Sequence, residues 1–272
     1  MNQSDSTPDV AKVDGTATGG HDAPDGAGPI AASQARPGRL LAMALGAGML
    51  AGLVSWLLGE VVLDYFRPPS RIVTTMGIKM DVPSRAGEHG AITRNVALAF
   101  GLLGATLGLA LGLAGGLARG SLPDASKGAL VGLATGAVAG AATTPALLPI
   151  YFRTISEDPL ATGLTIPLLV HGGIWTAVGA AGGLAFGIGF GAGRAQLIKI
   201  IMGGLVGGLV GTVAYELIGA FAFPMAYTPR PISETWGTRL IARLAVTIFA
   251  AAGVARGAAE SHPRVIANQR PE

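Results

Sequence analysis

The chain has 272 residues, of which 50% are hydrophobic and only 13% are charged, whereas a soluble domain carries about 25% charged residues. Its 43 glycines lie among long runs of Leu, Ile, Val and Ala, which excludes a collagen-like or low-complexity chain. The net charge is +3 and the bases are scattered, so nucleic-acid binding is not expected. Cysteine is absent, which excludes disulfides, thiolate metal sites and thiol nucleophiles.

The chain begins with a polar segment, residues 1–37, that is rich in aspartate and proline and poor in large apolar residues. Such a composition predicts a disordered tail. The apolar bundle is expected over residues 38–258, and residues 259–272 form a second polar tail. Within the long loop 67–94, residues 72–76 are either a short strand or an interfacial segment.

A membrane-spanning helix needs roughly 20 apolar residues. Five apolar segments reach this length, and a sixth is shorter. They are expected at about 40–63, 96–118, 128–152, 166–193, 197–223 and 240–255. The last segment is the shortest and contains Arg243, so it depends on its neighbours for burial. The predicted fold class is therefore an all-α integral membrane protein, a glycine-rich bundle of six spans.

Glycines recur at every fourth residue inside these spans. In water such helices would be poor, since glycine costs about 1 kcal/mol per position relative to alanine. In lipid the backbone must satisfy its own hydrogen bonds, so a helix forms, and a row of glycines lets a second backbone approach closely. The candidate helix-packing residues are Gly104, Gly108, Gly112, Gly116, Gly132, Gly136, Gly140, Gly179, Gly183, Gly187, Gly191, Gly203, Gly207 and Gly211.

The pattern of small residues indicates an internal repeat of three tandem two-helix hairpins. The first, third and fifth spans each follow a base and carry small residues at fourfold spacing; the register matches Ala44 with Gly132 and Gly203. Because each hairpin contains two spans, all three would insert in the same sense, with a pseudo-threefold axis along the membrane normal.

An even number of spans places both termini on one side of the membrane, called here the terminal side; the other is the distal side. The bases of the terminal side, such as Arg119 and Arg194, lie close to span ends, which favours a cytoplasmic location in a plasma or inner membrane. Every tryptophan and tyrosine falls in the distal half, where such rings anchor at the lipid–water boundary.

Ionisable residues inside a span are candidates for function. His171, Glu216 and Arg243 lie within about two turns of the distal ends of their spans, at ~1.5 Å per residue. We expect Glu216 to pair with Arg243 with His171 nearby, which gives either a polar vestibule with Glu216 as a proton or cation ligand, or one structural ion pair. Glu60 is closer to its span end, so its carboxylate is expected to reach the headgroups.

No catalytic or metal set is visible. Three of the four histidines lie in tails or a loop, so we expect neither a metal nor a cofactor. Gly187, Gly189 and Gly191 have the spacing of a dinucleotide turn but lie inside a span without a preceding strand, which favours helix packing. No serine has a histidine and an aspartate placed as a triad, so an enzyme is not expected.

The sequence leaves two functions open. The first is a structural or accessory membrane protein, packed through its glycine grooves, with the lipid bilayer and a second copy or another membrane protein as partners. The second is a small-solute or ion transporter or channel that uses the vestibule near Glu216, His171 and Arg243.

Overall fold

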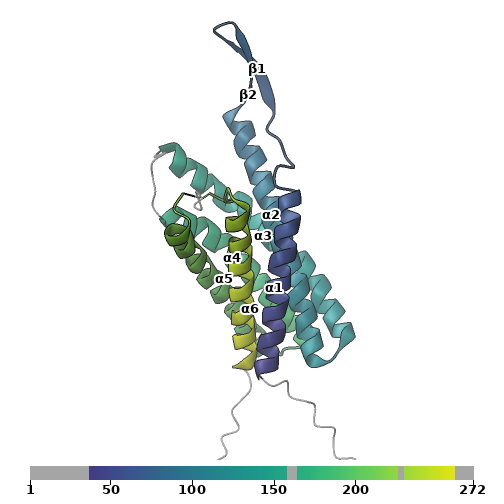
Figure 1. The fold of residues 1–272 in the computed structure, drawn as a ribbon. Coiled ribbons are helices and arrows are strands. Elements are labelled where there is room, and N and C mark those ends of the chain that lie inside the picture. The colour runs from purple at the N-terminus through teal and green to yellow at the C-terminus, as the bar shows by residue number, and fades with distance from the viewer. Residues whose placement is uncertain (1–36, 158–163, 226–229, 261–272) are drawn as a thin grey trace, which may run out of the picture. The chain divides into compact units, whose positions relative to one another are not determined.

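The computed structural model describes residues 37–157, 164–225 and 230–260. All of them belong to one compact unit, Ala35–Glu272, drawn in Figure 1. The two polar tails expected at 1–37 and 259–272 fall almost wholly outside the described residues.

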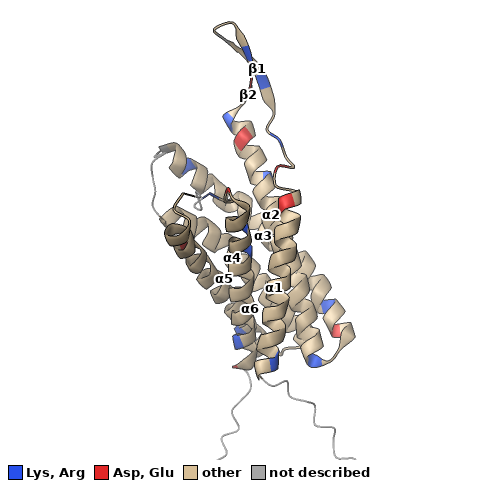
Figure 2. Cartoon of the chain, viewed as in Figure 1, with Lys and Arg blue, Asp and Glu red and all other residues tan. Residues whose placement is uncertain are grey.

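Six helices in the described part of the chain are long and apolar enough to cross a membrane, which confirms the prediction of a multi-pass membrane protein. They are α1 (Pro37–Val61), α2 (Arg85–Arg119), α3 (Leu122–Glu157), α4 (Thr165–Phe190), α5 (Arg194–Ala222) and α6 (Trp236–Ala259). Charged residues lie mostly toward the helix ends and on the hairpin, and the middle of the ribbon bundle carries few of them (Figure 2).

Two helices are longer than their apolar runs. The α2 helix starts at Arg85, ahead of the expected 96, because the Ser84 hydroxyl caps it by accepting from the Gly87 amide and Glu88 occupies the first turn. The α6 helix has 24 residues instead of the short span expected, because Thr235 caps its start and the charged Arg239 and Arg243 are included.

A β-hairpin connects α1 and α2, so the all-α prediction is incomplete. Strand β1 (Ser70–Thr75) pairs antiparallel with β2 (Ile78–Pro83). The turn is formed by Met76 and Gly77, both with positive φ (53° and 81°), as a tight two-residue hairpin turn requires. The strand alternative for residues 72–76 is thus confirmed, and β2 was missed.

The helices are arranged as three inner and three outer elements. Helices α2, α4 and α6 contact one another, while α3 packs between α2 and α4, α5 between α4 and α6, and α1 between α6 and α2. The inner helices supply most of the buried apolar side chains, among them Leu103, Leu107, Val178, Phe186 and Val254, and the outer helices add a few, such as Leu40, Leu148 and Ile200. Each outer helix therefore rests in the groove between two inner ones.

The α2–α3 contact is made backbone to backbone. A Cβ built on Gly104 would strike the carbonyl oxygen of Gly136, and one built on Gly108 would strike that of Gly132. Every such position excludes even a methyl group, because the opposing atom is backbone and cannot rotate away. Removing the side chain is what lets the two helix axes come this close.

The other candidate glycines divide among several contacts. Gly112 and Gly116 face Gly128 and Ala125, Gly140 faces Phe100, and Gly179, Gly183 and Gly187 face Gly204, Ile200 and Leu197; Gly203, Gly207 and Gly211 face Gly253, Phe249 and Ala245. Gly191 differs: it is the left-handed C-cap of α4, with φ 68°, and its neighbour is the Arg119 side chain. Its position was predicted as part of a packing row because the expected span ended at residue 193, three residues after the last residue of α4, Phe190.

We expect Gly136→Ala to lower the free energy of unfolding by about 1–3 kcal/mol, because the added methyl group overpacks the α2–α3 contact. Gly46→Ala is the matched control, since nothing lies within 4 Å of a Cβ at this exposed position of α1. Unfolding in mixed detergent micelles, followed by circular dichroism, measures both. Equal stabilities of the two variants would contradict the close-contact description.

Candidate buried polar site

Four helices bring the predicted ionisable residues to the distal half of the bundle. Glu60 lies near the end of α1 and Glu216 near the end of α5, while His171 and Arg243 lie near the starts of α4 and α6. His171, Glu216 and Arg243 are buried, and Glu60 is half-buried. The common depth of His171, Glu216 and Arg243 agrees with the prediction, whereas the predicted pairing of Glu216 with Arg243 is wrong.

Glu216 pairs with His171. Nδ1 of His171 lies 2.6 Å from Oε1 of Glu216, and the two side chains are only 3% and 2% exposed. The other ring nitrogen, Nε2, lies 3.4 Å from the carbonyl oxygen of Pro231. At 2.6 Å a proton must lie between Nδ1 and the carboxylate oxygen, because two lone pairs would otherwise repel each other. The two side chains therefore share one short hydrogen bond between α4 and α5.

Aromatic rings enclose the histidine. The indole of Trp175 stacks on the His171 ring, with centroids 5.1 Å apart and planes at 22°, and Tyr215 meets the ring edge-on at 5.9 Å. Trp175 in turn contacts Phe100 of α2 edge-on at 6.5 Å. The rings hold the imidazole in one orientation and separate it from the lipid.

Arg243 does not pair with Glu216. Its Nη1 donates to the carbonyl oxygen of Ala99 at 2.7 Å, and its guanidinium carbon lies 5.4 Å from the centre of the Phe100 ring. The expected pair fails because Glu216 continues the row Gly204, Gly208 and Thr212, at fourfold spacing, and this row faces α4. The α5 face toward α6 carries Gly203, Gly207 and Gly211 instead.

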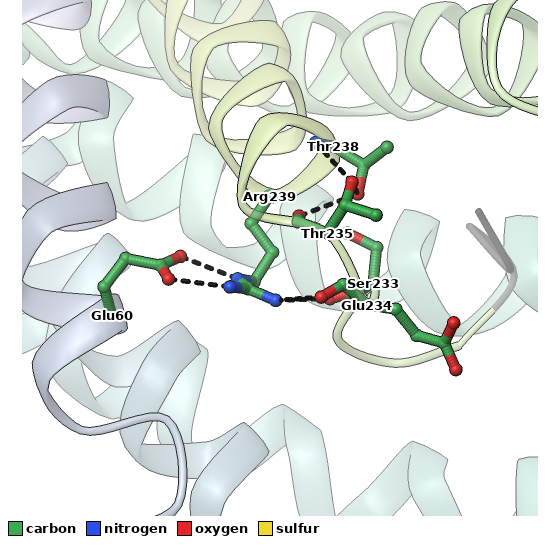
Figure 3. A network of polar contacts seen from close by, with 6 residues as sticks. All are labelled: Glu60, Ser233, Glu234, Thr235, Thr238 and Arg239. Carbon is green, nitrogen blue, oxygen red and sulfur yellow. Dashed lines mark hydrogen bonds and ion pairs between the residues drawn. The ribbon is translucent and has the colours of Figure 1, made fainter.

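Glu60 forms a two-pronged ion pair with Arg239, which the sequence analysis missed (Figure 3). Nε and Nη2 of Arg239 donate to the two carboxylate oxygens at 2.6 and 2.7 Å. Nη1 donates to the carbonyl oxygens of Ser233 and Glu234. The position of Glu60 at the headgroups stays a prediction, and Arg239, which lies inside α6 and reaches across to α1, is its protein partner. This pair ties α1, α6 and the segment before α6 together.

A cavity of about 20 Å³ lies between the two clusters, with room for about one water-sized particle. Its polar lining consists of His171, Trp175, Tyr215, Ser233, Arg239 and Arg243, and Phe100 and Ile232 belong to its apolar lining. The indole N–H of Trp175 and the hydroxyl of Ser233 are buried without a hydrogen-bond partner. The expected vestibule is thus a small cavity rather than a wide opening.

Across residues 37–157, 164–225 and 230–260, no three His, Asp or Glu side chains are grouped to hold a metal ion. No protein-family model matches the chain, and comparison with curated proteins and with solved structures gives no significant match. Function is therefore inferred from the packing of the helices and the chemistry of the buried site.

We expect His171→Phe to cost about 3–5 kcal/mol of stability, because it leaves the Glu216 carboxylate buried without its partner. Adding Glu216→Leu to that variant should restore most of the loss, since an apolar pair of similar volume has no charge to desolvate. Mixed-micelle unfolding of the single and double variants measures this. Additive losses would show that the two side chains do not act as a pair.

Proposed function

We propose that the chain is a structural or accessory membrane protein whose helices form a closed bundle. The observation that carries this proposal is the backbone contact of α2 with α3 at Gly104, Gly108 and Gly112, where the opposing atoms belong to Gly136, Gly132 and Gly128. A conduit needs side chains or water along its wall, whereas this contact leaves room for neither.

The distribution of buried polar groups supports a closed bundle. Among the described residues, the buried polar side chains lie in the middle or the distal half of the helices, from Thr247 near the middle of α6 to His171 near the distal end of α4. In the terminal half, α2 and α4 meet at Gly115 and Phe186, and the buried side chains there are apolar, such as Leu107 and Leu111. An ion crossing this half would have no polar group to replace its water.

The three-hairpin repeat belongs to the same proposal, with a corrected register. Gly132 and Gly136 of α3 face the preceding inner helix α2, and Gly48 of α1 faces α6. The α5 residues that face the preceding inner helix α4 are Gly204 and Gly208, one position later than the fourfold row chosen from the sequence. In this register all three outer helices use the same face, as a pseudo-threefold bundle requires.

We further propose that the termini are cytoplasmic and that the β-hairpin lies on the opposite side. The large side chains of the outer helices that point outward, such as Leu57, Val206 and Phe221, are apolar and suit lipid or a second membrane-embedded chain. Partners would therefore be the bilayer itself and a further copy or another membrane protein.

The chain has no cysteine, so single cysteines can report this topology. Met76→Cys, in the hairpin turn, should react with an impermeant maleimide from outside intact cells, because the Met76 side chain is 98% exposed. Ser126→Cys, at the exposed start of α3, should react only after the membrane is opened. Labelling of both cysteines in intact cells would overturn the six-span topology, and the reverse pattern would overturn the orientation.

A second function, a proton-linked transporter or channel for a small solute or ion, is favoured by one observation. The His171–Glu216 pair holds a shared proton inside a membrane-spanning region, and intramembrane carboxylates of this kind serve as proton relays in pumps. The same pair is also explained as a structural contact between α4 and α5.

Reconstituted liposomes separate the two functions. For a structural protein, we expect wild-type chain and Glu216→Gln to leave the permeability to protons and small ions at the level of empty liposomes, because the terminal half is closed. Flux through the wild type that is lost in Glu216→Gln, with unchanged circular dichroism and elution volume, would favour the transporter. Leu113→Met, at a partly exposed position of α2, is a control for substitution as such.

A further inference from the structure

We propose that the cavity between His171, Ser233 and Arg243 is a binding site for a single halide-sized anion, such as chloride. This goes beyond a structural role, because it assigns a ligand to the distal half of the bundle. The inference rests on three features of the described residues: a buried arginine with no carboxylate in contact, a lining of hydrogen-bond donors, and a cavity of fitting size.

Two arginines line the cavity, and only one of them bonds to a carboxylate. Glu60 forms two hydrogen bonds with Arg239 and acts on Arg243 only through its electrostatic field, while Glu216 is paired with His171. Arg243 is 7% exposed, and its neighbours are a carbonyl oxygen and an aromatic face, with no carboxylate within 4 Å in the described chain. A buried cation without a carboxylate in contact is costly, so an anion in the adjoining cavity would stabilise it.

The lining offers donors to such an anion. The Trp175 indole N–H can only donate, and the Ser233 hydroxyl, which lies beside the Tyr215 side chain, can rotate to donate; both are buried, and neither forms a hydrogen bond within 3.5 Å. Trp175, Ser233 and Arg243 all line the same cavity, and their residues are 2%, 5% and 7% exposed. A metal cation would instead require carboxylate or carbonyl oxygens around it, which the lining does not gather.

The size selects a monatomic ligand. A cavity of about 20 Å³ holds about one water-sized particle, so phosphate, sulfate and organic acids are excluded, whereas a halide ion fits. The bound ion would join donors from α4, α6 and the segment before α6. The ion would hold the distal ends of these elements together, and its negative charge would offset the positive charge of Arg243.

Chloride-35 NMR line broadening, measured on the full chain in micelles at constant ionic strength with gluconate as the replacement anion, tests the site. We expect saturable excess broadening that bromide competes away. Ser233→Ala and Trp175→Phe, which each remove one donor, should weaken binding about tenfold, as loss of a hydrogen bond to a charged group predicts; Ser233→Ala changes the volume least. Arg243→Leu should abolish it.

Arg256→Gln is the matched control, because this exposed arginine lies on the same helix and pairs with Glu260 at the surface. It should bind chloride like the wild type. If the wild type shows no saturable broadening, or if Ser233→Ala and Trp175→Phe both bind like the wild type, the anion site is overturned. Circular dichroism and elution volume show which variants are folded, and Ser233→Ala alone, which removes a single hydroxyl group, keeps the test valid if Arg243→Leu or Trp175→Phe fails to fold. The readout does not depend on whether the protein transports anything.

Discussion

Close approach of helix backbones is the constraint on which this structure depends. In lipid, burying an apolar side chain between two helices gains little, because the hydrocarbon tails are equally apolar. What remains is van der Waals contact, which grows as the helix axes approach. The carbonyl oxygens of Gly136 and Gly132 occupy the places where side chains of Gly104 and Gly108 would lie. The same device joins α4 to α5 at Gly179 and Gly204, and α5 to α6 at Gly203 and Gly253.

The two halves of the bundle differ in their chemistry. In the terminal half the interior is filled by apolar side chains such as Leu107, Leu111 and Phe186. In the distal half the close contacts continue, since Gly140 faces the backbone of Phe100 and Gly208 faces that of Trp175. There the rings of Phe100, Trp175 and Tyr215 pack against one another, and the buried His171 and Arg243 lie beside them.

The sequence predicted the number of spans and the depth of the polar residues, because both follow from the spacing of residues along one helix. Which residues pair depends on the rotation of each helix about its axis. The spacing of the glycines does not determine this rotation. Glycines occupy adjacent positions of α5, Gly203 beside Gly204 and Gly207 beside Gly208, so two rows at fourfold spacing fit equally well. The row that begins at Gly203 faces α6, whereas the row that begins at Gly204 faces α4 and leads to Glu216, with His171 opposite it.

Arg239 was missed for a different reason. The apolar run of the last span begins after it, so it was counted as a loop base, although Thr235 starts the helix before it. A helix boundary set by hydropathy alone excludes charged residues that are paired inside the protein. Once Thr235 is recognised as the cap, Arg239 and Arg243 are four residues apart on one face of α6, and a single acidic residue, Glu60, bonds to the first of them. The spacing of Arg239 and Arg243 along α6 therefore predicts that both arginines lie near Glu60. In the structure both arginines line one cavity, and only Arg239 bonds to the carboxylate.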